Sequence, residues 1–98
     1  MEEYLGRIAR SKAGRDKGGR FAVIGRADDA HVLIADGDVH KIAKPKRKKL
    51  MHLAFERAQI ADIGEILARP GGTGDAALRK ALNDDHENQG GIACPNQM

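Results

Sequence analysis

The chain has 98 residues and a formal net charge of +3, and 41% of its residues are apolar. A chain of this length fits one small domain and leaves little room for a deep substrate pocket. Its single cysteine, Cys94, excludes an internal disulfide, and no segment approaches the roughly 20 apolar residues of a membrane span. The N-terminus lacks a secretion signal. We therefore expect a cytoplasmic protein, not a disulfide scaffold, a membrane protein or a multidomain enzyme.

The charge is divided unequally along the chain. Residues 1–52 contain 13 lysines and arginines against 7 acidic residues, whereas residues 53–98 contain 4 against 7. Such an asymmetry between two halves predicts an anionic partner for the basic half.

Strand patterns dominate the first part of the chain. Residues 4–11 alternate imperfectly and predict a first strand, which is followed by a glycine-rich, charged loop. Residues 20–26 contain an aromatic and two β-branched residues and predict a second strand. His31–Ala35 is apolar on both faces and predicts a central third strand.

Two more strands are expected before residue 56. Asp36-Gly37-Asp38 is typical of a hairpin turn and predicts a returning fourth strand over Val39–Ile42. Leu50–Phe55 alternates weakly and predicts a short fifth strand. Five short strands with tight turns predict a small β-barrel over residues 1–55.

The pattern becomes helical after Phe55. Ile60, Ile63 and Leu67 recur at helical spacing until Pro70 ends the run. We expect these residues to begin a helical extension that spans residues 56–86.

A second helix is predicted over Asp75–Leu82. Thr73 or Asp75 is expected to be its N-cap, and the acidic residues that follow place its end near Asn83. Residues 87–98 are polar and glycine-containing and predict a disordered tail.

The loop between the first two strands is the first candidate site. Its glycines permit a close approach of the backbone to phosphates, and Arg15, Lys17 and Arg20 supply positive charge. Asp16 is expected to cap the turn. The alternative is a solvated hairpin loop. A nucleotide-binding P-loop is rejected, because Arg20 and Phe21 stand where that motif requires Lys and Ser or Thr.

The segment Lys41–Lys49 is the second candidate site. Six of its nine residues are basic and none is acidic. Pro45 favours an extended course, which suits contact with a nucleic-acid backbone. The alternative is a solvated basic linker.

Neither a catalytic site nor a metal site is predicted. His31, His40, His52 and His86 lack the spacing of metal ligands, and no histidine is paired recognisably with a serine or cysteine. We therefore expect no enzyme activity, no cofactor, no metal and no small-molecule substrate. The three aromatic residues are too few for base stacking, which favours contacts with the nucleic-acid backbone.

Two stretches of the sequence resemble a known RNA-binding family. Gly6–Gly18 followed by Phe21–Ile24 resembles the KOW motif, with Gly18 as its key glycine. Ile34–Asp38, then Lys41 and Lys44–Leu53, are similar to the bacterial KOW-domain RNA-binding proteins. These proteins are relatives of the archaeal and eukaryotic ribosomal protein L-fourteen-e family. The resemblance covers residues 4–55, and it is weaker over Asp75–Leu82.

The resemblance implies an SH3-like β-barrel that binds RNA, with ribosomal RNA as the usual partner and ribosomal proteins as further neighbours. The RNA contacts that it implies are Lys12, Arg15, Lys17, Gly18 and Arg20 in the loop, and Lys44, Lys46, Arg47, Lys48 and Lys49 in the basic run. Ala54-Phe55-Glu56 departs from the Lys-Pro-Thr-like segment of the family, which leaves the role of the helical part open. The alternative function is a protein-interaction module of SH3-like type in translation or transcription complexes.

Overall fold

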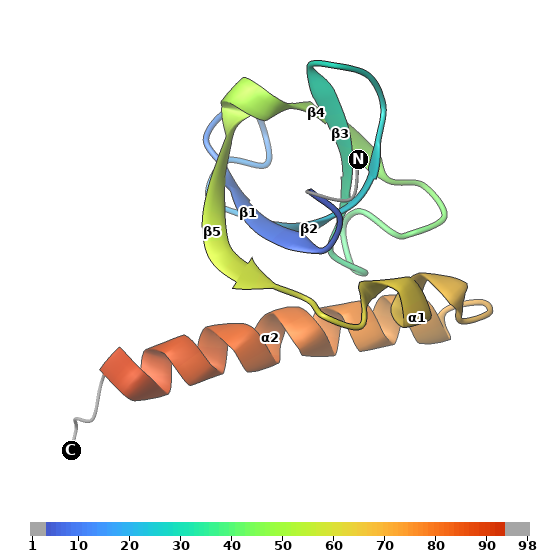
Figure 1. The fold of residues 1–98 in the computed structure, drawn as a ribbon, viewed down its shortest axis with the longest axis vertical. Helices are drawn as coiled ribbons and strands as arrows, with labels where there is room; N and C mark the ends of the chain where they lie inside the picture. The colour runs from blue at the N-terminus through green and yellow to red at the C-terminus, as the bar shows by residue number, and fades with distance from the viewer. Residues whose placement is uncertain (1–3, 94–98) are drawn as a thin grey trace.

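The computed structural model describes residues 4–93, with side chains described as far as residue 84. The protein is mainly β, with one five-stranded antiparallel sheet and two helices (Figure 1). In chain order the elements are β1 (Arg7–Ser11), β2 (Arg20–Arg26), β3 (His31–Ala35), β4 (Lys46–Lys49), the 3₁₀-helix η1 (Leu50–His52), β5 (Leu53–Gln59), α1 (Ile63–Ala68) and α2 (Thr73–Ala93).

The sheet has the strand order β4-β3-β2-β1-β5. β1 pairs with β2 on one side and with β5 on the other, so that Ala9 faces both Phe21 and Phe55. The strands curve around a common centre, with η1 leading from β4 to β5 (Figure 1). The sheet is not closed by a ladder between β4 and β5 in the described part of the chain.

Both faces of the curved sheet are buried. Its concave face carries a first core of Ala9, Phe21, Val23, Val32, Ile34 and Leu53. Its other face carries a second core, in which Ile8, Ala22 and Ala35 meet Ile60, Ile63, Ile66, Leu78 and Leu82. Consecutive buried residues such as Ile8 and Ala9 follow from this arrangement, and β3 is apolar on both faces as expected.

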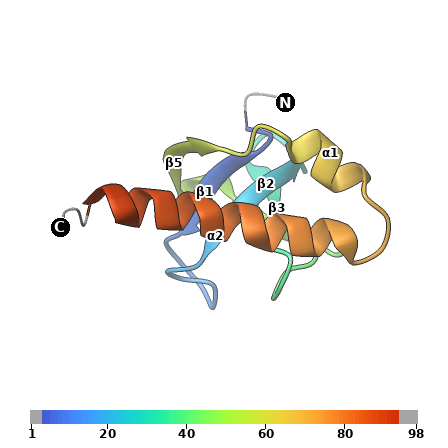
Figure 2. The same ribbon diagram turned by 90° about the horizontal axis from the view of Figure 1, so that it is seen from below.

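Helix α2 crosses the outer face of the sheet and holds the loop between β3 and β4 (Figure 2). Ala22 and Ala35 are fully buried, and their small side chains let the helix approach. Gly37 has a φ of 79°, and an added Cβ would overlap the carbonyl oxygen of Asp75. The Asp75 carboxylate accepts the Ile42 N–H at 2.8 Å, and Arg79 donates to the Gly37 carbonyl. The first turns of α2 therefore fix the shape of this loop.

The predicted fourth strand over Val39–Ile42 is wrong. The Asp36 carboxylate accepts the N–H groups of Asp38 and His40, at 2.9 and 3.0 Å, and the segment forms a turn. The Ile42 N–H then donates to Asp75 of α2, so it is not available for a hydrogen bond to a neighbouring strand. The fourth strand is instead Lys46–Lys49, the last four residues of the basic run, and it lies at the edge of the sheet.

Other strand boundaries also differ from the prediction. β1 begins only at Arg7, because the Arg7 N–H donates to the Tyr4 carbonyl and closes a turn over residues 4–6. Leu50–His52 forms the 3₁₀-helix η1, and β5 runs from Leu53 to Gln59.

The helices are confirmed, but their bounds differ. α1 begins at Ile63, so Ile60 precedes it, and Pro70 lies beyond its end as expected. Thr73 is the first residue of α2, while Asp75 bonds to Ile42, so the predicted N-cap is wrong.

The end of α2 also differs from the prediction. The helix continues past Asn83 to Ala93, and no proline lies between Pro70 and Pro95 to interrupt it. Residues 87–93 of the predicted disordered tail are therefore helical, while residues 94–98, with Cys94, lie outside the described residues. Neither helix of the described chain is long and apolar enough to cross a membrane.

Candidate nucleic-acid interface

Loop 12–19, which connects β1 to β2, is closed by its own backbone. The Gly18 N–H donates to Ser11, the Gly19 N–H donates to Asp16, and the Ser11 N–H donates to Gly19, all at 2.8–2.9 Å. Gly18 has a φ of 89°, a conformation that side chains rarely tolerate. Its N–H is used inside the loop, so Gly18 shapes the loop and does not offer that group to a phosphate.

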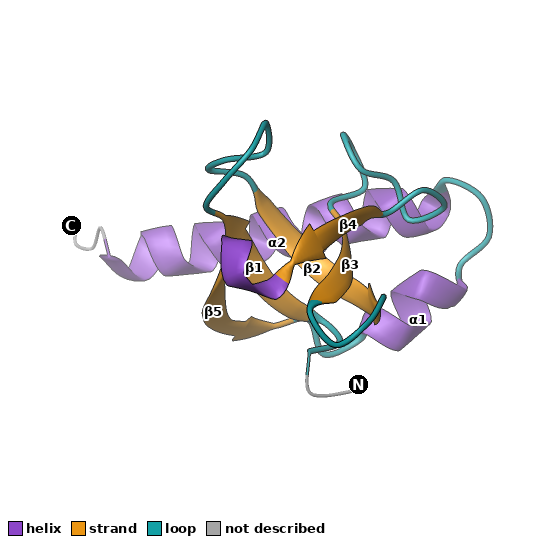
Figure 3. Cartoon of the chain, turned by 90° about the horizontal axis from the view of Figure 1, so that it is seen from above, coloured by secondary structure: helices purple, strands orange, loops and turns teal. Residues whose placement is uncertain are grey.

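Asp16 joins three segments that are far apart in the sequence. One of its carboxylate oxygens lies 3.0 Å from His40 Nε2, and the other lies 3.8 Å from Lys48 Nζ. Lys48 Nζ also donates to the Ala13 carbonyl at 3.0 Å. Loop 12–19 and the loop between β3 and β4 accordingly project from the same end of the sheet (Figures 2 and 3). This contact brings the two candidate sites of the sequence together.

The environment of Asp16 favours its charged form. Burial alone would raise the pKa of its carboxyl group. The hydrogen bond and charge of His40, with the charges of Lys48 and Lys46, outweigh burial and lower the pKa below its ordinary value. An ionised Asp16 therefore holds the loop on β4, instead of merely capping the turn.

Lys12, Arg15 and Lys17 form what we call the outer rim of the loop. All three residues are exposed. Within the described part of the chain, no hydrogen bond or ion pair engages their side chains. The backbone N–H of Lys12 donates to the His52 carbonyl at 2.8 Å, which fixes the start of the loop beside η1. The outer rim thus presents three cations on a well-anchored backbone.

Arg20 has a structural position, unlike the outer rim. Its guanidinium makes a two-pronged ion pair with Glu56, with distances of 3.0 and 2.8 Å, and donates to the Leu82 carbonyl at 3.0 Å. Only 12% of its side chain is exposed. Arg20 therefore ties β2 to β5 and α2, and its charge is used inside the fold.

Strand β4 buries one residue of the basic run and leaves its other three residues exposed. Lys48 is buried, with 8% of its surface exposed, and faces the first core opposite Val32. Lys46, Arg47 and Lys49 are exposed. Lysines on an edge strand also oppose pairing with a second chain, so part of this pattern has a purely structural explanation.

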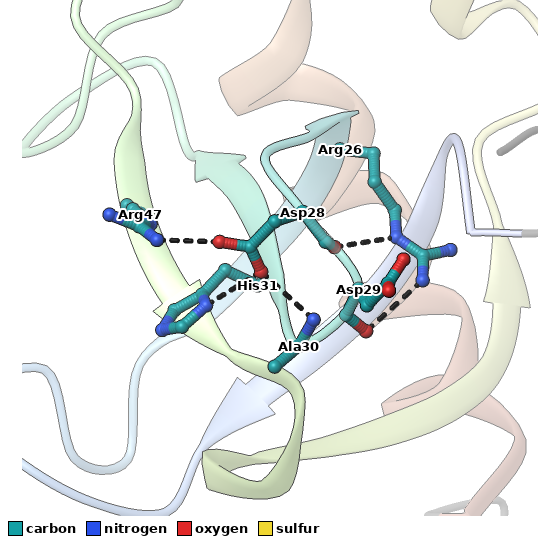
Figure 4. A network of polar contacts seen from close by, with 6 residues as sticks. All are labelled: Arg26, Asp28, Asp29, Ala30, His31 and Arg47. Atoms are coloured by element: carbon teal, nitrogen blue, oxygen red, sulfur yellow. Dashed lines mark hydrogen bonds and ion pairs between the residues drawn. The ribbon is translucent and has the colours of Figure 1, made fainter.

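Arg47 belongs to a polar network around Asp28 in the β2–β3 turn (Figure 4). The Asp28 carboxylate contacts His31 Nδ1 at 2.8 Å, the Ala30 N–H at 2.9 Å and Arg47 Nη2 at 2.6 Å. The hydrogen bond to His31 is the largest of the contributions that hold the pKa of Asp28 far below its usual range. Arg47 is consequently paired, although it remains exposed.

Lys44 lies at a different place on the surface. It lines a hollow beside the α1–α2 connection, together with Lys41, Arg69 and Asp75. The structure therefore groups Lys44 with the helical layer, and it groups Lys46 and Lys48 with loop 12–19 through Asp16.

A second hollow, which we call the β4 hollow, has a volume of about 340 Å³. Its lining residues are all basic or histidine: His31, Lys46, Arg47, Lys48, Lys49 and His52. Sequence reasoning missed His31 and His52 because it looked for metal-ligand spacing. The position of His52, three residues after the basic run, is the signal that would have found it.

The fold and the surface define a small β-rich domain with one strongly basic region. Among the residues whose side chains are described, no three His, Cys, Asp or Glu side chains gather where they would hold a metal ion. No model of a known protein family matches the chain, and no curated protein matches it.

Proposed function

We propose that this protein is a non-enzymatic RNA-binding protein that holds RNA through its phosphate backbone. The proposed contacts are the three outer-rim residues, Lys12, Arg15 and Lys17, together with Lys46 and Lys49 of β4. One observation carries the proposal: the contacts of Asp16 and Lys48 join loop 12–19 to β4, while these five cations remain exposed.

Charge and chemistry support a polyanion as the partner. A backbone that is already fixed loses little entropy on binding, and Lys and Arg side chains suit phosphate oxygens. None of these five cations forms a hydrogen bond or ion pair in the described chain. Only Lys46 has an acidic side chain, Asp16, near enough to act on its charge, and a phosphate backbone would supply the countercharge for the others.

The KOW resemblance supports RNA in particular. We propose that the chain is a KOW-domain protein related to the L-fourteen-e family, that its sheet is an SH3-like barrel, and that it acts on ribosomal RNA in the cytoplasm. The pairing of β1 with both β2 and β5, and the short η1 between β4 and β5, agree with that barrel. The position of Gly18 in a closed loop between β1 and β2 agrees with the KOW motif.

Binding of a labelled RNA hairpin, measured by fluorescence anisotropy at several salt concentrations, tests this function. Five phosphate contacts predict that log K falls with log salt at a slope of about −3 to −5. A DNA hairpin of matching sequence should bind more weakly, because its B-form stem places the phosphates at a different spacing from those of an A-form RNA stem. A slope near zero, or equal affinity for both hairpins, would contradict RNA binding of this kind. Sedimentation with ribosomes at low salt tests the ribosomal partner, and a chain that stays at the top of the gradient excludes it.

A further inference from the structure

We propose that the β4 hollow is a pocket for one phosphate group of the bound RNA, in which His31 and His52 act together with Lys46 and Lys49. This inference rests on the proposed function and adds two histidines that neither the sequence nor the resemblance assigned. The β4 hollow has a volume of about 340 Å³, which lies at the lower end of the range for ligand sites and suits a small group.

The two histidines of the β4 hollow lie on elements that a backbone hydrogen bond holds together. His31 is the first residue of β3, and His52 is the last residue of η1. The Leu50 N–H donates to the Ala30 carbonyl at 2.8 Å, which holds η1 against the β2–β3 turn. The backbones that carry the two histidines are therefore held together without a ligand.

Some of the charged side chains around the hollow are bonded within the fold, and others are not. Lys48 is bonded to Ala13, and Arg47 is paired with Asp28. The side chains of Lys46 and Lys49 form no hydrogen bond or ion pair in the described residues. Both ammonium groups belong to residues that line the hollow, where no acidic residue lies, and the charge of Lys46 also acts on Asp16.

The imidazole rings add hydrogen-bond donors when they are protonated. The Asp28 carboxylate accepts the Nδ1–H of His31 at 2.8 Å, so the other ring nitrogen of His31 donates to a phosphate oxygen only in the imidazolium form. Asp28 is the carboxylate that faces this group, and it orients the ring as well as offsetting part of the local charge. A phosphate oxygen accepts hydrogen bonds from ammonium and imidazole N–H groups, and such charge-assisted bonds are short and strong.

The β4 hollow continues the surface of the outer rim. The His52 carbonyl accepts the Lys12 N–H at 2.8 Å, so the end of η1 and the start of loop 12–19 are in contact. An RNA backbone that lies on the outer rim therefore passes next to the hollow. This continuity favours an RNA phosphate over an unrelated anion as the occupant.

NMR of the histidine ring C–H groups tests the pocket directly, with inorganic phosphate as the probe and sodium chloride at equal ionic strength as the reference. We expect saturable shifts for His31 and His52, and much smaller shifts for His40, which is held by Asp16. Equal shifts for all three histidines, or shifts that chloride reproduces, would overturn the pocket.

A second measurement separates this inference from the proposed function. The variant Lys49→Gln/His52→Ala should lose the phosphate-induced shift of His31 and bind the RNA hairpin about three- to tenfold more weakly, with a shallower salt slope. Lys49→Gln alone should show part of the effect if the double variant folds poorly. The control Arg57→Gln changes one charge at an exposed part of β5.

The outcomes are distinct. If the pocket variants bind RNA as the wild type does, while loss of the outer rim weakens binding, the pocket is wrong and the proposed function stands. If the wild-type protein binds no RNA, the proposed function fails as well.

Discussion

Two regions of the basic half use their charges in opposite ways. In the outer rim, Lys12, Arg15 and Lys17 are exposed, and no contact within the described chain holds their side chains. In what we call the inner anchor, the half-buried Arg20 and the buried Lys48 are bonded to Glu56, Leu82 and Ala13. A count of basic residues therefore overstates the charge that is available to a partner, because part of that charge builds the surface that presents the rest.

The largest expected effect is on the inner anchor. Arg20→Ala removes both prongs of the ion pair and leaves Glu56, with 18% of its side chain exposed, without this partner. Removing one member of a buried pair is costly, and for this partly buried pair we expect the free energy of unfolding to fall by about 2–4 kcal/mol. Urea unfolding followed by circular dichroism measures the change.

Arg57→Ala is the control for that experiment, since Arg57 is exposed on β5. It should change stability by less than about 0.5 kcal/mol. Equal losses of unfolding free energy in Arg20→Ala and Arg57→Ala would contradict a structural role for the inner anchor.

A smaller effect is expected within β4 itself. Lys48→Met keeps an unbranched chain in the buried position but removes the bonds to Ala13 and Asp16, and should cost about 1–2 kcal/mol. Lys46→Met makes the same chemical change two residues away, at an exposed position, and should leave stability nearly unchanged. Thermal and urea unfolding of both variants measure the difference between the buried and the exposed lysine. A larger loss of stability in Lys46→Met than in Lys48→Met would contradict the structural role of Lys48.

The smallest effect is on acid stability. Because the pKa of Asp16 is lowered in the fold, its ionised form stabilises the protein above its ordinary pKa of about 3.8. That contribution is lost as the pH falls below this value and through the pKa of the folded state. Between pH 5 and pH 3 the wild type should therefore lose more stability than Asp16→Asn. Parallel losses in the two proteins would show that Asp16 is not held as the structure indicates.

Sequence patterns predicted the elements with strong apolar signals. β2 and β3 have aromatic or β-branched residues, and both were placed correctly. The basic strand β4 was missed because lysine and arginine carry no strand signal, and its partner β3 decides its conformation. Val39–Ile42 looked like a strand, but the carboxylates of Asp36 and Asp75 take its backbone N–H groups.

The sequence predicted which segments form the candidate site, but it did not predict how their side chains are arranged. Loop 12–19 and the basic run were both singled out, yet nothing local indicates that Lys48 is buried or that Arg20 reaches Glu56, 36 residues away. The contact of Arg20 depends on the sheet order, which places β1 between β2 and β5, and the burial of Lys48 depends on the pairing of β4 with β3. The polar network at Asp28 likewise requires β3 and β4 to be adjacent.

The most direct test of the account compares two variants that lose the same charge in different places. Lys12→Gln/Arg15→Gln/Lys17→Gln neutralises the outer rim, while Arg57→Gln/Arg69→Gln/Lys80→Gln neutralises three exposed cations of β5 and the helical layer. Binding of the RNA hairpin should weaken about 10- to 100-fold in the first variant, with a salt slope shallower by about 2–3, and much less in the second. Equal losses in both variants would show that net charge alone attracts RNA, and would contradict the assignment of loop 12–19 as the contact surface.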